Sequence, residues 1–368
     1  MNIKTITCHD VYNYGASLQA YALQEYLISQ GHKVEIIDYK PDYMRVHYNF
    51  WYVPENSHYY KKAMSSKLIH FLLCCYFAPR RFATYGRKKK FDAFREKFLK
   101  CTRRYFSYEE LVADAPAADA YIAGSDQIWN SNLPNGKDPG YFLQFGSGNT
   151  KRIAYAASFG IPEVAEAHRP VMSKWLQKFD AISVREKTAL KILETLNAKG
   201  INVVDPVFLL PQKEWSKFAG EKRMIKEKYI LVYDLDLSNE DLKVEAKRLN
   251  ALYNYKIVAV NGFAKCPYAH KSIKDAGPQE FLNLIKNAEF VISNSFHATS
   301  FCVIFNKQFA TFYKHKNISR MTDLLECVGL KASLNAQKPK YEYNWNEVNK
   351  KLIEMCALSY DYIKNNTR

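Results

Sequence analysis

Hydrophobic residues along the chain follow two spacings. Short apolar runs rich in β-branched and aromatic residues predict buried strands, and longer segments with apolar residues three and four positions apart predict helices. The charged stretch 211–228 divides this pattern into two series. Strands are predicted at 3–8, 33–39, 119–125, 152–158, 181–186 and 202–210 in the first series, and at 229–235, 256–262, 289–294 and 308–313 in the second.

Predicted helices alternate with these strands. They lie at 18–30, 164–178, 187–197, 239–252 and 278–288, after residue 295, and at 346–365. Strands that alternate with helices predict parallel, doubly wound sheets. We therefore expect an α/β protein with two Rossmann-like domains, residues 1–210 and 211–345, facing a cleft in the GT-B-like arrangement of one large class of glycosyltransferases. A C-terminal helix within 346–368 is expected to pack back toward the first domain.

Composition places the chain among globular proteins. Its 368 residues are 48% hydrophobic and 24% charged, and the length favours two domains. The opening stretch MNIKTITCHDVYNYG lacks the apolar core of a signal peptide, and no stretch has the ~20 apolar residues that span a bilayer. Eight cysteines without a CxxC pair fit neither a zinc framework nor a secreted disulfide scaffold, so we expect a reduced cytoplasm. We expect no metal and no cofactor, and the single glycine of the first strand–helix turn, Gly15, argues against an NAD-type site.

The net charge of +16 is concentrated in one segment. Residues 61–104 hold 14 Lys and Arg against two acids, within a predicted basic helical insertion at about 45–110. The insertion contains the apolar run LIHFLLCCYFAPRR, 68–81, which is too short to cross a membrane. Flanked by cations, it suits the surface of an anionic leaflet, where each basic residue contributes roughly 1 kcal/mol. The alternative is a core helix beside a solvated basic helix. No nucleic-acid motif accompanies the charge, so we expect no nucleic-acid partner.

The segment FVISNSFHATSFCVIF, 290–305, predicts a strand, a turn and a helix. Ser293, Asn294 and Ser295 are favourable N-cap residues, so His297 falls in the first turn of the helix. In a parallel sheet such a turn lies at the carboxyl edge, where ligands bind, and a helix N-terminus attracts anions. A functional role for His297 competes with simple packing or capping.

Other polar residues also fall on predicted carboxyl edges. Arg185 ends a strand and suits a carboxylate or phosphate, unless it pairs with an acid such as Glu186. The stretch NYGAS places Asn13 and Ser17 at the start of the first helix, as a wall of the cleft or as a tight turn. The remaining histidines considered have no comparable setting and are expected to pack or to lie on the surface: His9, His32, His270 and His315.

The loop GSDQIWN, 124–130, combines an acid, an amide and an aromatic residue at the end of a strand. Asp126 and Gln127 would hydrogen-bond sugar hydroxyls, with Trp129 beside a sugar face. The alternative is a capped turn in which Ser125 and Asp126 satisfy backbone N–H groups and Trp129 belongs to the core.

Six stretches together resemble the polysaccharide pyruvyl transferase family. They are NYGASLQAYAL (13–23), AGSDQIWN (123–130), SVREKTAL (183–190), DPVFLL (205–210), SNSFHATSFCVIFNKQF (293–309) and ISRMTDLLECVGL (318–330). They occur in the family's order and span most of the chain apart from the basic insertion. The resemblance implies two Rossmann-like halves and the donor phosphoenolpyruvate. The pyruvyl unit would be moved onto a sugar hydroxyl pair as a cyclic ketal, with release of phosphate, in the synthesis of a bacterial surface polysaccharide such as a capsule or exopolysaccharide.

The implied chemistry assigns roles to the candidate residues. Protonating the methylene carbon of the donor and activating sugar hydroxyls need an acid/base near neutral pH, which favours His297, with Asp126 as an alternative base. The carboxylate and phosphate of the donor need cations and N–H groups. The donor-binding candidates are Arg185, Ser295, Phe296, Lys314 and Arg320, and the acceptor-binding candidates are Asn13, Ser17, Gln127 and Trp129.

Position 295 departs from the family pattern. Active members often carry an arginine two positions before the histidine, where this chain has Ser295. Arg320 or Lys314 would then supply the missing charge. We expect the acceptor to be a saccharide on a lipid diphosphate, reached by a cytoplasmic protein that is peripheral to the inner face of the membrane. The alternatives are a sugar-nucleotide-dependent glycosyltransferase and a non-catalytic saccharide-binding relative.

Overall fold

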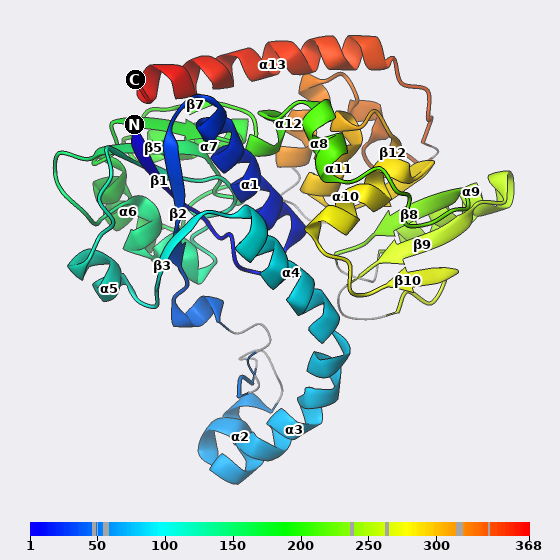
Figure 1. Ribbon diagram of the computed structural model, residues 1–368, viewed down its shortest axis with the longest axis horizontal. Coiled ribbons are helices and arrows are strands. Elements are labelled where there is room, and N and C mark those ends of the chain that lie inside the picture. Colours follow the sequence, from blue (N-terminus) through cyan, green and yellow to red (C-terminus); the bar gives the residue numbers. More distant parts are fainter. Residues whose placement is uncertain are drawn as a thin grey trace.

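Two parallel β-sheets organise the chain. The computed structural model describes residues 1–368 except 46–48, 50, 54–58, 236–238, 262–264, 314–318 and 338. The first sheet has seven strands in the order β3-β2-β1-β4-β5-β6-β7, and the second has five in the order β10-β9-β8-β11-β12 (Figure 1). The strands are β1 (Asn2–Ile6), β2 (Lys33–Tyr39), β3 (Cys101–Tyr105), β4 (Ala120–Ala123), β5 (Lys151–Ala157), β6 (Ala181–Val184), β7 (Ile201–Asn202), β8 (Tyr229–Tyr233), β9 (Lys256–Val260), β10 (Lys271–Ile273), β11 (Phe290–Ser293) and β12 (Gln308–Thr311).

Each sheet contains one point at which the chain reverses its direction of winding. In the first sheet this point lies between β1 and β4, and in the second between β8 and β11. Loops that leave the carboxyl ends of two such strands diverge and form a crevice, where doubly wound sheets bind ligands. The predicted fold class, with two Rossmann-like halves, is therefore confirmed.

Helices follow most strands and cover the sheets. They are α1 (Tyr14–Ser29), α2 (Tyr60–Ser65), α3 (Lys67–Ala83), α4 (Tyr85–Phe98), α5 (Tyr108–Ala113), α6 (Arg169–Leu176), α7 (Lys187–Thr195), α8 (Gln212–Phe218), α9 (Glu240–Tyr253), α10 (Pro278–Asn287), α11 (Phe296–Ile304), α12 (Ser319–Cys327) and α13 (Trp345–Asn366). Successive strand residues are buried on opposite faces, as in Ile36 and Ile37, because both faces of a doubly wound sheet are covered.

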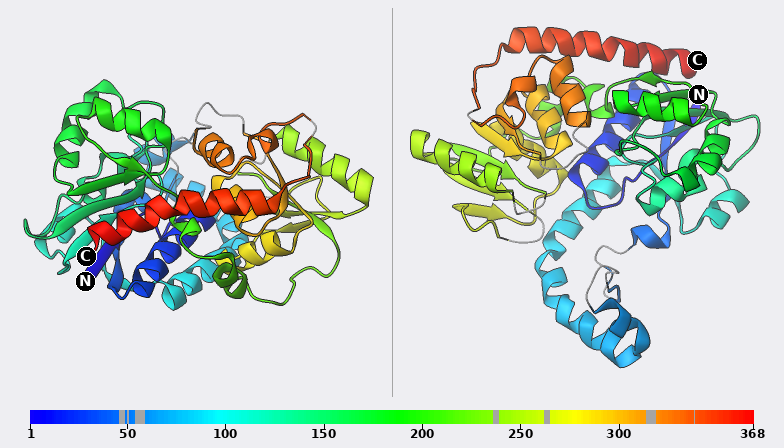
Figure 2. Two further views of the ribbon diagram at one scale, coloured as in Figure 1. Left: turned by 90° about the horizontal axis from the view of Figure 1, so that it is seen from above. Right: turned by 180° about the vertical axis from the view of Figure 1, so that it is seen from behind.

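One hydrophobic core runs from the first sheet into the second. It includes Ile3 and Ile153 of the first sheet together with Leu231 and Val291 of the second. The last helix, α13, lies across both halves (Figures 1 and 2). Its Tyr362 hydroxyl donates to the carbonyl oxygen of Ala154 at 2.9 Å, so α13 is tied to the first sheet. These contacts fix the position of the carboxyl edge of the first sheet relative to that of the second sheet.

The basic insertion contains three consecutive helices, of which α4 packs on the main core through Phe91 and Phe94. Helices α2 and α3 make a hairpin that projects from the body of the molecule, and α4 connects the hairpin to the body (Figure 1). Several large apolar side chains of α3 are exposed, among them Leu68, Leu72 and Tyr76. The alternative prediction of a core helix at 68–81 is therefore wrong. Among the described residues, no helix combines the length and the apolar character that crossing a membrane requires.

The predicted strand 202–210 is the main local error. Only Ile201–Asn202 pair as β7, and Pro206–Phe208 form a 3₁₀ turn. Pro206 has no N–H for a ladder, and the carboxylate of Asp205 accepts from the backbone N–H of Val207 at 3.1 Å, which caps the turn instead. The sequence pattern also missed the short elements β3, α5 and β10.

Candidate active site

A cavity of about 190 Å³ lies where the carboxyl edges of the two sheets face each other. The first half contributes the loops after β1 and β4, and the second half contributes the loops after β8, β11 and β12 and the start of α12. Seven of the residues predicted from the sequence line the cavity: Asn13, Asp126, Gln127, Ser295, Phe296, His297 and Arg320. Both winding reversals thus open onto the same hollow.

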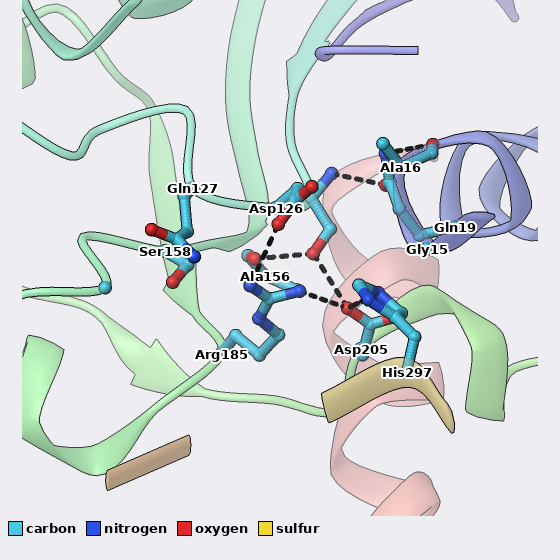
Figure 3. Close-up of polar contacts among 12 residues, drawn as sticks. Gly15, Ala16, Gln19, Asp126, Gln127, Ala156, Ser158, Arg185, Asp205 and His297 are labelled. Carbon is cyan, nitrogen blue, oxygen red and sulfur yellow. Dashed lines mark hydrogen bonds and ion pairs between the residues drawn. The ribbon is translucent and has the colours of Figure 1, made fainter. Parts of the chain in front are cut away.

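His297 lies in the first turn of α11, as predicted. The hydroxyl of Ser295 caps this helix by accepting from the backbone N–H of Ala298 at 3.4 Å. The His297 side chain is 10% exposed, and its Nε2 lies 3.5 Å from Oδ2 of Asp205 (Figure 3). The imidazole therefore reaches across from the second half of the molecule to a carboxylate of the first.

Asp205 is held from several directions. Its Oδ2 accepts from Nη1 of Arg185 at 2.6 Å (Figure 3). The same oxygen accepts from the Ser125 hydroxyl at 3.2 Å, and Oδ1 accepts from the backbone N–H of Val207. The carboxylate is fully buried. Its position is consequently fixed, and it fixes the orientation of the His297 ring.

Arg185 occupies the floor of the site rather than the wall of the cavity. Its side chain is 1% exposed and pairs with two carboxylates, Asp205 at 2.6 Å and Asp126 at 3.2 Å. It does not pair with Glu186, whose carboxylate accepts from the hydroxyl of Ser158 at 3.0 Å. The prediction that Arg185 grips a donor directly is therefore revised: both ends of its guanidinium are already occupied, and the residue positions two carboxylates.

The electrostatic environment keeps both carboxylates ionised. Burial alone would raise the pKa of Asp205, but the neighbouring His297 and Arg185 hold it well below its ordinary value. Burial would likewise raise the pKa of Asp126, and the charge of Arg185 outweighs it and lowers that pKa. A carboxylate with a lowered pKa is a weak base, so Asp126 is poorly suited to take a proton from a sugar hydroxyl.

Gly15 allows the first half to approach the imidazole closely. A Cβ atom added at this position would lie 2.0 Å from Nδ1 of His297. The adjacent Asn13 caps α1 by accepting from the backbone N–H groups of Gly15 and Ala16 at 2.9 and 3.3 Å. The glycine in NYGAS is therefore needed because the two halves approach each other closely at this point, and not only because the chain turns there.

Arg320 brings a second guanidinium to the cavity. Its side chain starts from the first turn of α12, and its guanidinium lies 5.9 Å from the centre of the Phe296 ring, on which Arg185 also rests at 4.9 Å. When the Gln127 amide oxygen faces it, that oxygen accepts from Nη2 and Nη1 of Arg320 at 2.8 and 3.0 Å. Burial and the charge of Arg185 lower the pKa of Arg320. Arg185 pairs with two carboxylates, whereas Arg320 forms no ion pair with any residue that the structure describes.

Besides Arg185, two predicted site residues that the structure describes, Trp129 and Ser17, do not line the cavity. Trp129 is fully buried, stacks on Phe142 and donates from Nε1 to the carbonyl oxygen of Tyr141 at 3.1 Å, so it is a core residue and cannot stack on a sugar. Ser17 is buried in α1 and its hydroxyl faces the carbonyl oxygen of His9. Lys314 lies outside the described residues.

Sequence reasoning missed Asp205 as a site residue. The signal was present, because DPVFLL was among the motifs and Asp205 follows β7 closely, just as Arg185 follows β6. Asn294 and Tyr313 also line the cavity without having been assigned a role. Within the described ranges, no three His, Cys, Asp or Glu side chains are grouped as metal ligands would be.

Comparison with known proteins places these features in a family context. The sequence model of the polysaccharide pyruvyl transferase family matches residues 13–315. None of the curated proteins compared is significantly similar in sequence.

Solved structures of similar fold are distant in sequence. The UDP-GlcNAc 2-epimerase from Methanocaldococcus jannaschii is 12% identical, with 97% of this chain and 93% of that one covered and a TM-score of 0.49. The epimerase from Neisseria meningitidis bound to UDP-GlcNAc is 10% identical, with 100% and 93% covered and a TM-score of 0.49. The spinosyn forosaminyltransferase SpnP is 9% identical, with 100% of both chains covered and a TM-score of 0.43.

Proposed function

The chain belongs to the polysaccharide pyruvyl transferase family, and from this premise we propose that it moves the pyruvyl unit of phosphoenolpyruvate onto two hydroxyls of a sugar as a cyclic ketal. Membership makes it a transferase that modifies polysaccharides. The observation that carries the finer proposal is the imidazole of His297 at the cavity, fixed by the buried carboxylate of Asp205.

The reaction needs one group that both gives and takes a proton. Phosphoenolpyruvate and a diol form the ketal and inorganic phosphate without water: one hydroxyl proton ends on the former methylene carbon, and the other leaves with the phosphate. Because Nε2 of His297 faces Asp205, Nδ1 is the nitrogen that exchanges protons with donor and acceptor. Asp205 faces the ring and orients it, and a positioned acid–base group typically contributes about 10²–10⁴-fold.

The donor is a small dianion or trianion, and the cavity offers it three kinds of support. Arg320 supplies a guanidinium suited to a phosphate or carboxylate. The start of α11 supplies the positive end of a helix dipole. Asn13 and Asn294 add amide groups to the wall. Arg320 thereby replaces the arginine that the family often carries where this chain has Ser295.

The acceptor side of the proposal rests on Asp126 and Gln127. Both line the cavity from the loop after β4, and the ionised Asp126 offers a hydrogen-bond acceptor to sugar hydroxyls. We propose a saccharide carried on a lipid diphosphate as the acceptor, in the assembly of a bacterial surface polysaccharide such as a capsule or exopolysaccharide. The protein would then work in the cytoplasm, at the inner face of the membrane.

Product analysis with two donors tests the proposed reaction. The protein is incubated with phosphoenolpyruvate or with UDP-sugars and a panel of galactosides, glucosides and mannosides on short lipid diphosphates, and released phosphate or UDP is measured. We expect phosphate from phosphoenolpyruvate and a glycoside heavier by one pyruvyl ketal. Release of UDP with transfer of a sugar would replace the proposal with a glycosyltransferase, and release of neither product would favour a binding protein.

A further inference from the structure

The α2–α3 hairpin, residues 59–83, exposes an apolar face that packs on no other part of the described chain. One side of α3 packs on α2 through Cys74, with Ala63 and Val53 in the same small cluster. Leu68, Leu72 and Tyr76, which recur every four residues, point away from this cluster and are 68%, 56% and 74% exposed. The hairpin lies at the end of a projection, far from both sheets (Figures 1 and 2).

Further large apolar side chains surround this stripe. Phe71 and Phe82 lie on α3, and the exposed aromatic residues Trp51 and Tyr59 lie in the segment that precedes it. Aromatic residues with one polar atom are typical of the boundary between membrane and water. Water-soluble monomers rarely leave such a contiguous apolar surface open unless it binds something.

The positive charge of the hairpin indicates which kind of partner its apolar face binds. Residues 59–83 contain five Lys and Arg and no Asp or Glu. Lys61, Lys62 and Lys67 are exposed on the hairpin itself. A second copy of the same hairpin would bring like charges together, whereas an anionic lipid surface complements them.

The cations farther along the insertion serve the body of the protein instead. Lys90 of α4 reaches Glu280 of α10 at 2.8 Å, and Arg104 pairs with Asp38 at 3.0 Å. Arg95 also pairs with Asp38, at 3.4 Å. The second half of the basic segment 61–104 therefore helps to tie α4 and β3 to the body, whereas the exposed apolar stripe lies on the hairpin.

We propose that the α2–α3 hairpin inserts the apolar stripe of α3 into the boundary region of an anionic bilayer, while Lys61, Lys62 and Lys67 contact the lipid head groups. The inference deepens the proposed function, on which it rests for the choice of a lipid-linked acceptor, by naming the part of the chain that meets the membrane. Binding is then partly hydrophobic and does not depend on charge alone.

Vesicle sedimentation of the full chain tests the hairpin. Vesicles of phosphatidylglycerol and phosphatidylcholine in equal parts are compared with vesicles of phosphatidylcholine alone. We expect binding to the anionic vesicles that is at least tenfold weaker in the double variant Leu72→Glu, Tyr76→Glu. The matched control Val244→Glu, Leu252→Glu changes two exposed apolar residues of α9 and is expected to bind like the wild type. Replacing all three lysines by Gln is expected to weaken binding about 100-fold.

High salt distinguishes insertion of the apolar stripe from attraction between the lysines and the anionic lipids alone. In roughly 1 M salt, where the Debye length is about 3 Å, we expect the wild type to retain measurable binding to the anionic vesicles. Complete loss in salt, wild-type binding by the double variant, or no binding at all would each overturn the proposal. So would a wild-type dimer in light scattering that the double variant converts to a monomer, because the stripe would then be an interface between copies.

The result of the vesicle experiment does not depend on whether the proposed pyruvyl transfer takes place. We expect the double variant on α3 to release phosphate from phosphoenolpyruvate at the wild-type rate when the acceptor is a water-soluble, short-chain glycoside. Failure of vesicle binding with intact phosphate release would overturn the hairpin proposal only. Vesicle binding without any phosphate release would overturn the proposed function only.

Discussion

Gly15 lies directly against the imidazole of His297: a Cβ atom added at Gly15 would be 2.0 Å from Nδ1. The glycine belongs to the first turn of α1, in the first half of the molecule, and the histidine to the first turn of α11, in the second. In a helix, alanine is ordinarily favoured over glycine by roughly 0.5–1 kcal/mol. At position 15 the contact with His297 makes glycine the favoured residue instead.

Replacing Gly15 by alanine is therefore expected to displace the ring of His297. We expect a fall in turnover of at least tenfold and a loss of about 1–3 kcal/mol in the free energy of unfolding, the usual cost of an inserted methyl group in a packed site. Phosphate release and urea unfolding measure the two effects. Gly148→Ala is the matched control, since nothing lies within 4 Å of a Cβ there. Equal turnover in Gly15→Ala and Gly148→Ala would show that Nδ1 needs no such space.

Replacing Asp205 by asparagine keeps the shape of the side chain and removes its charge. The His297 ring loses the charged partner that orients it, so we expect turnover to fall about 10²–10³-fold with little change in the KM for phosphoenolpyruvate. Arg185 also loses one of its two carboxylates, and breaking a buried pair costs about 3–5 kcal/mol of stability. Ser125→Ala removes a hydroxyl that contacts Asp205 and the carbonyl oxygen of Ala156, and it serves as the mild comparison. Turnover of Asp205→Asn within threefold of the wild type would contradict the positioning role.

Arg320 is expected to act through donor binding. A hydrogen bond to a charged group is worth about 1.5–3 kcal/mol, so Arg320→Gln should raise the KM for phosphoenolpyruvate about 10- to 100-fold and change turnover less. The matched control, Arg223→Gln, removes an exposed arginine on the surface of the second half and should leave both constants unchanged. A variant Arg320→Gln with unaltered KM would mean that another cation holds the donor.

His9 makes a second buried ion pair, and its effect on stability depends on pH. Its Nε2 lies 3.3 Å from Oδ1 of Asp38. Burial alone would lower the pKa of His9, but Asp38 raises it from 6.5 to about 10. The folded protein therefore binds this proton more tightly than the unfolded chain, and the stabilisation is complete below about pH 6.5 and lost as the pH rises toward 10.

Urea unfolding of the wild type and of His9→Gln at several pH values tests this pair. Between about pH 6 and pH 10 we expect the stability of the wild type, relative to the variant, to fall by more than about 2 kcal/mol, since one pKa unit corresponds to about 1.4 kcal/mol. Two stability curves that stay parallel across this range would contradict a protonated His9 in the folded state. The histidine was expected only to pack or to lie on the surface, and its charge was not foreseen.

The fold could be predicted because its signal is periodic and local. Alternating apolar runs predict the two parallel series, and the N-cap residues 293–295 place His297 in the first turn of a helix without knowledge of the rest of the chain. Arg320 could be proposed for the same kind of reason, as a cation near the start of a helix. The structure brings it to the cavity with His297.

The partners within the site could not be predicted, because they come from distant parts of the chain. The segment 202–210 has the composition of a strand, so the sequence did not indicate a role for Asp205. In the structure the segment forms a 3₁₀ turn, and Asp205 contacts Arg185 and His297. Trp129 follows a polar turn, a pattern shared by sugar-stacking and core aromatics, and only its complete burial distinguishes them. Burial likewise decides that Arg185 holds carboxylates of the protein.

The most direct measurement compares phosphate release from phosphoenolpyruvate by the wild type and by His297→Asn, in the presence of an accepted glycoside. Donor binding is followed by calorimetry and folding by circular dichroism, so that catalysis is separated from both. We predict a loss of turnover of about 10²–10⁴-fold, with the Kd for phosphoenolpyruvate changed by only a few-fold and the fold intact. A folded His297→Asn protein that forms the ketal within tenfold of the wild-type rate would contradict the account.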